Sequence, residues 1–235
     1  MPGSECHLAG RALQALELLS AQPLTAPQLA AALRIHPRTS RRLLTRLTQD
    51  GWLARSDRRA RTYAPTMRIA PLAALVVQRD AVVELATPHV RAVSAALGGP
   101  AHLMIPSYRW MLCILHGDGT APRAGLHELV PCHATASGKA LLGRWSEWRA
   151  SVLASVADPR AVLDDVAAAM VRGYATDDGE WRDGERAVAA PVFDGDGGAR
   201  WSLACTVAGP RDLDRAGRFV AEHADELSSQ LAARR

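Results

Sequence analysis

The chain has 235 residues, of which 48% are hydrophobic and 22% charged, and its formal net charge is +4. This length and composition support a packed core in one large domain or two modest ones and argue against a wholly disordered chain. No run of about 18 apolar residues is present, so we expect neither a membrane span nor a membrane partner. The first residues, MPGSECHLAGR, lack the basic and apolar regions of a secretory signal.

Cysteine usage indicates the compartment. The four cysteines are scattered along the chain and form no C-x-x-C pair. We therefore expect neither a disulfide framework nor a structural zinc site, and we expect a cytoplasmic location. We also expect no cofactor.

The charges are distributed unevenly along the chain. Residues 1–68 contain 11 arginines and four acidic residues, a net charge of +7, whereas the remaining residues carry a net charge of −3. This asymmetry favours a basic nucleic-acid-binding module joined to a nearly neutral domain. The alternative explanation of this asymmetry is that the chain comes from an arginine-rich proteome and that its charges became uneven by random drift.

Three helices and two short strands are predicted in the first 66 residues. Leucines at helical spacing predict the first helix over Leu8–Ser20, and Thr25 is the predicted N-cap of the second. The third helix is predicted to run from Pro37 to Asp50. Two strands follow, at Trp52–Arg55 and Thr62–Ala64, and this order of elements is typical of a winged helix-turn-helix.

The predicted third helix has two contrasting faces. At about 100° per residue, Leu43, Leu44 and Leu47 fall on one side. The opposite side is rich in arginine and lacks the acidic residues that usually accompany basic ones on a solvated helix. Arginine pairs with guanine, and arginine, serine and threonine contact phosphates, so we predict that this face reads double-stranded DNA. The candidate residues on the helix are Arg38, Thr39, Arg41, Arg42 and Thr45.

The turn between the two predicted strands is also basic. It is suited to contact with the DNA backbone or the minor groove. Its candidate DNA-binding residues are Arg58, Arg59 and Arg61.

Residues 67–80 are predicted to form a linker helix, and residues 81–235 a second domain. A helix over Val82–Leu97 is followed by short strands at Ala101–Ile105, Trp110–Leu115 and Leu126–Val130. Helices at Ala136–Trp145, Ser146–Val156 and Asp158–Arg172 precede strands at Glu185–Phe193 and Arg200–Ala208 and a last helix at Asp212–Arg234. Strands mixed with helices and joined by short connections predict an α+β domain on an antiparallel sheet.

Several sequence blocks resemble the IclR family of transcriptional regulators. They are LAAALRIHPRTSRRLLTRLTQDGWL in the first domain, then PCHATASGKALLG, RGYATDDGEWRDGERAVAAPVFD and the AGP that closes the last strand, in the order and spacing of the family. The resemblance implies a winged helix-turn-helix, a linker helix used in dimerisation, and a GAF-like effector-binding domain. It also implies a homodimer or homotetramer, with organic acids or aromatic compounds as effectors.

The resemblance further implies a ligand site beneath the loop that precedes GKALL. The strand predicted at Ala101–Ile105 is expected to add an apolar wall to this ligand site. Its phase leaves open which side chain points inward, and Met104 is our candidate. Relatives carry Cys or Ser where this chain has Ala187 and Ala208, so we expect a more apolar and roomier pocket. The candidate effector-binding residues are Met104, Ala136, Ser137, Asp177, Ala187, Thr206 and Ala208.

The only lysine of the chain, Lys139, raises the question of catalysis. A phosphate-binding P-loop is excluded, because His133 stands where its first glycine is required and Ala140 follows the lysine in place of Ser or Thr. An S-x-x-K nucleophile would need serine at Ala136. A Ser137–Lys139 dyad is compatible with the spacing alone, but nothing nearby favours one, so we expect no catalytic residues and no enzyme.

Metal binding is the second alternative for this region. His102, Cys113, His116, Cys132 and His133 lie within a short span, and zinc is bound by both residue types. Their spacing matches no standard site, so we predict no metal ligands.

The sequence therefore predicts a DNA-binding transcriptional regulator that is controlled by a small-molecule effector. One alternative is a ligand-binding or enzymatic domain with a vestigial basic head. Another is a protein that binds DNA without sequence preference.

Overall fold

The computed structural model describes residues 3–57, 59–125, 128–209 and 212–234. The chain divides into two compact units, Met1–Leu75 and Val76–Arg235. Among the described residues, no helix combines the length and the apolar character needed to cross a bilayer.

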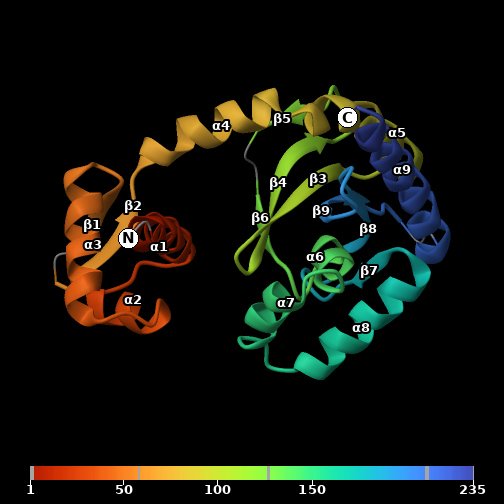
Figure 1. Ribbon diagram of the computed structural model, residues 1–235. Coiled ribbons are helices and arrows are strands. Elements are labelled where there is room, and N and C mark those ends of the chain that lie inside the picture. The colour runs from red at the N-terminus through yellow and green to blue at the C-terminus, as the bar shows by residue number, and fades with distance from the viewer. Residues whose placement is uncertain (1–2, 58, 126–127, 210–211, 235) are drawn as a thin grey trace. The chain divides into compact units, whose positions relative to one another are not determined.

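Three helices and a hairpin form the first unit (Figure 1). A capping box starts the second helix, in which the Thr25 side chain accepts a hydrogen bond from the Gln28 backbone while the Gln28 side chain accepts one from the Thr25 backbone. The ring of His36 caps the third helix by accepting a hydrogen bond from the Arg38 backbone. The elements are α1 (Gly3–Ala21), α2 (Ala26–Ala32), α3 (Pro37–Gln49), β1 (Leu53–Asp57) and β2 (Thr62–Pro65).

A leucine-rich core holds this unit together. Leu43, Leu44 and Leu47 of α3 are buried against Leu19 of α1 and Leu29 of α2. The buried face of α3 is therefore the one that the leucine spacing predicts. A short 3-10 helix, Met67–Ile69, and α4 (Ala70–Arg79) follow the hairpin.

The second unit is built on an antiparallel sheet. Its strand order is β5-β4-β3-β9-β8-β7. The seventh strand, β6, also pairs with β4. The strands are β3 (Ala101–Ser107), β4 (Trp110–Gly117), β5 (Arg123–Ala124), β6 (Leu129–Pro131), β7 (Ala175–Asp178), β8 (Arg186–Phe193) and β9 (Ala199–Thr206).

Helices cover both faces of this sheet (Figure 1). On one face, α5 (Ala81–Leu97) and α9 (Leu213–Ala233) bury valines and leucines against β3, β4, β8 and β9. On the other face lie α6 (Ala136–Leu142), α7 (Ser146–Leu153) and α8 (Pro159–Arg172). The second unit is thus an α+β domain on an antiparallel sheet, as predicted.

Some predicted boundaries differ from those of the structure. The helix predicted over Ala136–Trp145 ends at Leu142, and Trp145 instead precedes α7. The strand predicted over Leu126–Val130 corresponds to β6, Leu129–Pro131, and its first two residues lie outside the described part of the chain. The last strand ends at Thr206 rather than Ala208. Strand β7 was not predicted, because the polar sequence ATDD is typical of a turn.

The central strand β9 contains an unusual polar group. Ser202 is fully buried, and its Oγ has no hydrogen-bond partner in the described structure. Burying a hydroxyl without a partner costs free energy, because the group loses its hydrogen bonds to water.

We expect Ser202→Ala to raise the free energy of unfolding by about 1 kcal/mol, because the variant removes this unpaired hydroxyl. Ser94 is the matched control, since its buried Oγ donates a 2.9 Å hydrogen bond to the Gly99 carbonyl. Ser94→Ala should lower stability by a similar amount. Chemical denaturation of both variants measures the difference, and a loss of stability in Ser202→Ala would contradict the argument.

Candidate functional site

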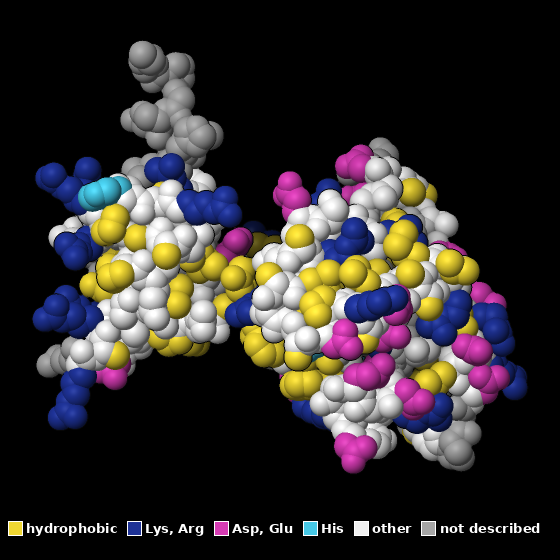
Figure 2. Space-filling model, turned by 90° about the horizontal axis from the view of Figure 1, so that it is seen from below, with side chains coloured by type: hydrophobic (Ala, Val, Ile, Leu, Met, Phe, Trp, Pro, Cys, Tyr) yellow, Lys and Arg dark blue, Asp and Glu magenta, His cyan; other side chains and the backbone are white. Residues whose placement is uncertain are grey.

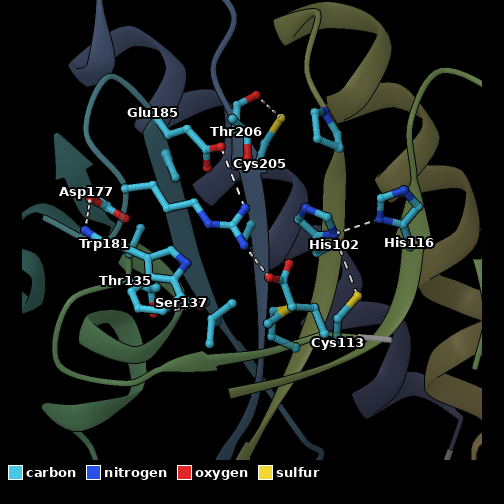
Figure 3. A pocket seen from close by; sticks show the side chains of 18 of the residues that line it. His102, Cys113, His116, Thr135, Ser137, Asp177, Trp181, Glu185, Cys205 and Thr206 are labelled. Carbon is cyan, nitrogen blue, oxygen red and sulfur yellow. Dashed lines mark hydrogen bonds and ion pairs between the residues drawn. The ribbon is translucent and has the colours of Figure 1, made fainter. Parts of the chain in front are cut away.

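A cavity of about 810 Å³ lies in the second unit, between the sheet and the chain segments that enter α6 and join β7 to β8 (Figure 3). Its apolar wall includes Met104, Val130, Ala136, Ala187 and Ala204. Cavities of roughly 300–1,000 Å³ accommodate small organic ligands, so this one has the right size for a ligand site.

The start of α6 forms one side of the cavity. Thr135 caps this helix: its Oγ1 donates to the Pro131 carbonyl at 2.7 Å and accepts from the Gly138 N–H at 3.4 Å. A Cβ on Gly138 would lie 2.0 Å from the carbonyl oxygen of Cys132, so only glycine permits this close approach. The tight entry holds Ala136 and Ser137 against the cavity.

Asp177, at the edge strand β7, is a buried acid that lines the cavity. Its Oδ1 accepts hydrogen bonds from the backbone N–H groups of Gly179, at 3.2 Å, and Glu180, at 2.9 Å. Burial, together with the neighbouring Glu180 carboxyl group, raises the pKa of Asp177 to about 7. Asp177 therefore changes its charge near neutral pH.

Glu180 is held in its ionised form by its contacts with Asp177 and Lys139. Burial opposes this ionisation, but hydrogen bonds from Asp177 and Lys139 outweigh it and lower the pKa of Glu180 to about 2. The Nζ of Lys139 lies 2.8 Å from Glu180 Oε1 and 3.0 Å from Asp165 Oδ2. Lys139 itself is 2% exposed. Its ammonium group thus ties α6 to α8 and to the loop after β7.

These contacts do not assemble a Ser–Lys dyad. The Oγ of Ser137 donates to Thr135 Oγ1 at 3.3 Å, whereas the amine of Lys139 is bound by the two carboxylates. The lysine lies outside the set of residues that line the cavity.

The cavity also has charged lining residues that the sequence analysis missed. Arg182 forms ion pairs with Glu128, at 2.5 Å, and with Glu185, at 3.7 Å, and its guanidinium lies 5.7 Å from the ring centroid of Trp181. Arg123 lines the cavity as well. The charged run GEWRDGER after β7 could have pointed to Trp181, Arg182 and Glu185, whereas Arg123 and Glu128 lie outside it. The expected apolar character therefore describes only part of the cavity.

Histidine and cysteine side chains occupy another part of the cavity wall. His102, Cys113 and His116 point toward one another from β3 and β4 (Figure 3). Burial raises the pKa of the Cys113 thiol to about 12, and this thiol donates a 3.4 Å hydrogen bond to the Leu115 carbonyl. Cys132 and His133, which the sequence analysis considered with them, are not part of this cluster.

Six of the seven candidate effector-binding residues line the cavity, namely Met104, Ala136, Ser137, Asp177, Ala187 and Thr206. The seventh, Ala208, is exposed, lies beyond the end of β9 and is not a lining residue. The strand ends two residues earlier than predicted, and beyond it the Ala208 N–H donates to the Leu97 carbonyl at the end of α5. The structure also shows which side chain of β3 points inward. Met104 lines the cavity, whereas Leu103 is buried on the other face of the sheet, in the core with α5 and α9.

The candidate DNA-binding residues lie on the first unit. Arg38, Arg41, Arg42 and Thr45 of α3 are exposed, and Thr39 is half-buried. Arg59 and Arg61 are exposed in the turn between β1 and β2, and Arg58 lies outside the described residues.

Figure 2 shows basic side chains around the first unit with few acidic ones, whereas acidic and basic groups alternate on the second unit. The excess of positive over negative charge in the first unit matches the requirement for contacts with phosphate.

Comparison with known proteins identifies the family. The family model for the C-terminal domain of bacterial IclR transcriptional regulators matches residues 74–232, so the chain belongs to the IclR family. It is a transcriptional regulator with a C-terminal effector-binding domain. The resemblance found in the sequence blocks is confirmed.

Individual relatives agree with this assignment. The chain is 29% identical to the HTH-type transcriptional regulator BhcR of Paracoccus denitrificans, over 96% of this chain and 87% of that protein. The structure of an IclR family regulator from Brucella abortus matches with a TM-score of 0.70 at 17% identity, covering 97% of this chain and 92% of that one. An IclR homolog from Microbacterium hydrocarbonoxydans, solved in complex with 4-hydroxybenzoate, matches with a TM-score of 0.61 at 20% identity, covering 96% and 99%.

The raised pKa of Asp177 predicts a pH-dependent stability. The folded chain retains the Asp177 proton at pH values where the unfolded chain has released it. The stabilisation is therefore fully present below pH 3.8 and is lost as the pH rises through about 7. The lowered pKa of Glu180 acts in a separate window, since its contribution is complete above pH 4.5 and is lost only as the pH falls toward 2.

We expect the wild-type chain to lose stability relative to Asp177→Asn as the pH rises from 5 to 7, with a slope approaching about 1.4 kcal/mol per pH unit. The variant keeps the Oδ1 acceptor but cannot titrate. Urea denaturation of both proteins across this range measures the difference in stability. The histidines are present in both proteins, so their contributions cancel in this difference. Parallel pH profiles for the two proteins would contradict the shift.

Proposed function

We propose that the chain binds an operator in double-stranded DNA through a winged helix-turn-helix at residues 1–66 and senses a small-molecule effector through a GAF-like domain at residues 81–235. Residues 67–80 form the linker between them. The observation that carries the proposal is the exposed arginine face of α3 in a chain that belongs to a family of transcriptional regulators.

The charges support the DNA-binding part. Exposed arginines at positions 38, 41 and 42 follow one another on α3, and the first unit has few acidic groups to neutralise them. Arginine reads guanine in the major groove and also contacts phosphates, so one helix face can supply both affinity and specificity. The turn with Arg58, Arg59 and Arg61 would add backbone contacts.

The cavity supports the effector part. It combines apolar wall residues such as Met104 and Ala187 with the cations Arg123 and Arg182. This combination suits a compact organic acid, aromatic or aliphatic, because the apolar wall receives its carbon skeleton and a guanidinium attracts its carboxylate. The complex of the Microbacterium relative with 4-hydroxybenzoate is consistent with this ligand class.

Regulation requires a link between the effector and the DNA-binding unit. We propose a homodimer or homotetramer in which the effector changes the spacing of two α3 helices. Leu72, Leu75 and Val76 are exposed on α4, as expected for a helix that pairs with another copy. The effector can shift this equilibrium only by its difference in affinity for the two states.

We expect Arg42→Ala to weaken operator binding by roughly 1–3 kcal/mol with thermal stability unchanged, because Arg42 is exposed on the proposed reading face. Mobility shifts on the DNA upstream of its own gene measure the affinity. Arg160→Ala removes an exposed arginine of α8 and is the control for the loss of one positive charge. Equal affinities for Arg42→Ala and Arg160→Ala would contradict the choice of face.

The same assay distinguishes this function from the alternatives. Binding through several phosphates must weaken steeply as salt rises, and a flat response would exclude DNA binding by this unit. Equal affinity for random duplex would instead indicate a protein without sequence preference.

We expect 4-hydroxybenzoate to raise the melting temperature of the wild-type chain, and Ala187→Leu to abolish that rise by filling the cavity. Ala168→Leu adds the same volume at an exposed position of α8 and should keep the response. A shift that survives in Ala187→Leu would show that the acid binds elsewhere.

A further inference from the structure

Strand β4 contains a bulge where it pairs with β3. Leu103 faces Leu115 and Met104 faces Cys113, so Ile114 has no partner of its own in the register. In a regular strand, side chains alternate between faces, and Cys113 would lie on the face opposite to His116. The extra residue reverses the alternation. Ile114 and Leu115 therefore both pack into the core beneath α5 and α9, whereas Cys113 turns to the cavity face.

The bulge brings three metal-binding side chains together. His102 and His116 are direct cross-strand partners, and their Nδ1 atoms lie 3.2 Å apart. The Sγ of Cys113 lies 3.6 Å from Nδ1 of His102. One ligand atom from each of the three residues falls within 4.8 Å of the other two.

These separations match the edges of a zinc tetrahedron. Zinc–nitrogen bonds of about 2.05 Å and zinc–sulfur bonds of about 2.3 Å give edges of roughly 3.3 Å between two nitrogens and about 3.6 Å between nitrogen and sulfur. The two distances, 3.2 and 3.6 Å, already have these lengths. The third edge, between the ligand atoms of Cys113 and His116, is at most 4.8 Å, so a small movement of the side chains completes the tetrahedron.

We propose that His102, Cys113 and His116 bind a zinc ion in the wall of the cavity, with its fourth coordination position open toward the cavity. Three protein ligands with one open position is the arrangement that lets zinc accept an external ligand. Binding converts the thiol to a thiolate and releases its proton to solvent. One part of the proposal rests on the proposed function, namely that the open position would accept a carboxylate oxygen of the effector.

A carboxylate behind His116 supports this arrangement. The Nε2 of His116 lies 3.6 Å from Oδ2 of Asp118, while its Nδ1 faces His102. Asp118 is held in turn by the hydroxyl group of Thr120, at 2.6 Å, and by Arg123, at 3.0 Å. A carboxylate at the outer ring nitrogen orients a metal-binding histidine and increases its basicity.

A second histidine pair provides a control. His89 and His223 approach to 3.0 Å between α5 and α9, with Glu226 nearby, but none of the three lines the cavity. Cys205 provides a second control, because it lines the cavity and is not part of the three-residue cluster.

The test uses the full-length chain after removal of metal with a chelator. Zinc is titrated against a chromophoric chelator, and cobalt is titrated separately while its absorption is recorded. We expect one tightly bound ion per chain and a thiolate-to-cobalt charge-transfer band. Cys113→Ser should abolish that band, and His102→Gln or His116→Gln should weaken zinc binding by at least about 100-fold. Asp118→Asn should weaken it by about 10- to 100-fold.

The control variants Cys205→Ala and His223→Ala should bind zinc as the wild type does. Circular dichroism establishes that each variant is folded. X-ray absorption at the zinc edge of the wild-type chain needs no variant, and it should report one sulfur and two imidazole ligands. Zinc binding that survives in Cys113→Ser, or a zinc site without sulfur, would overturn the proposal.

The open position has its own test. Adding 4-hydroxybenzoate to the cobalt-loaded chain should change the cobalt d–d absorption. An unchanged spectrum at a concentration that raises the melting temperature would exclude the metal as the effector's anchor. Because metal binding is measured without DNA and without effector, failure of the metal site leaves the proposed regulatory function standing, and the reverse also holds.

Discussion

The ion pairs of the buried Lys139 ammonium group are the interaction that joins the helices and the loop packed beside the cavity. A charge that is 2% exposed is tolerated only with partners, and its two carboxylates come from different elements, Asp165 of α8 and Glu180 of the loop after β7. The lysine follows directly on the helix start that holds Ala136 and Ser137 against the cavity. Removal of the charge would leave two carboxylates without their shared partner and loosen the link between α6, α8 and the loop after β7, so the single lysine of the chain has a structural role.

The same contact sets the electrostatics of the cavity. Burial raises the pKa of Asp177, and the ionised Glu180 beside it, which Lys139 helps to stabilise, adds to this effect, so Asp177 is the group that holds a proton near neutral pH. The cavity therefore contains an acid that can donate a hydrogen bond, together with the cations Arg123 and Arg182. An anionic ligand meets less repulsion there than the number of carboxyl groups suggests.

The two units rely on different physical effects. In the first, the leucine face of α3 provides the core, and its other face is left with arginines that have few acidic neighbours. In the second, a sheet covered on both faces forms the frame, and a bulge in β4 changes which of its side chains face the cavity.

Much of the fold was determined by the sequence alone, because its signals are local. Leucine spacing, the N-cap at Thr25 and the proline at position 37 predicted the helices of the first unit, and motif order predicted the family. The tertiary structure decided what depends on partners distant in sequence. It joined Lys139 to Asp165 and Glu180, paired the polar strand β7 with β8, and excluded Ala208 from the cavity. It also placed Cys113 beside His102 and His116, because a bulge shifts strand phase by one residue and leaves no mark in composition or spacing.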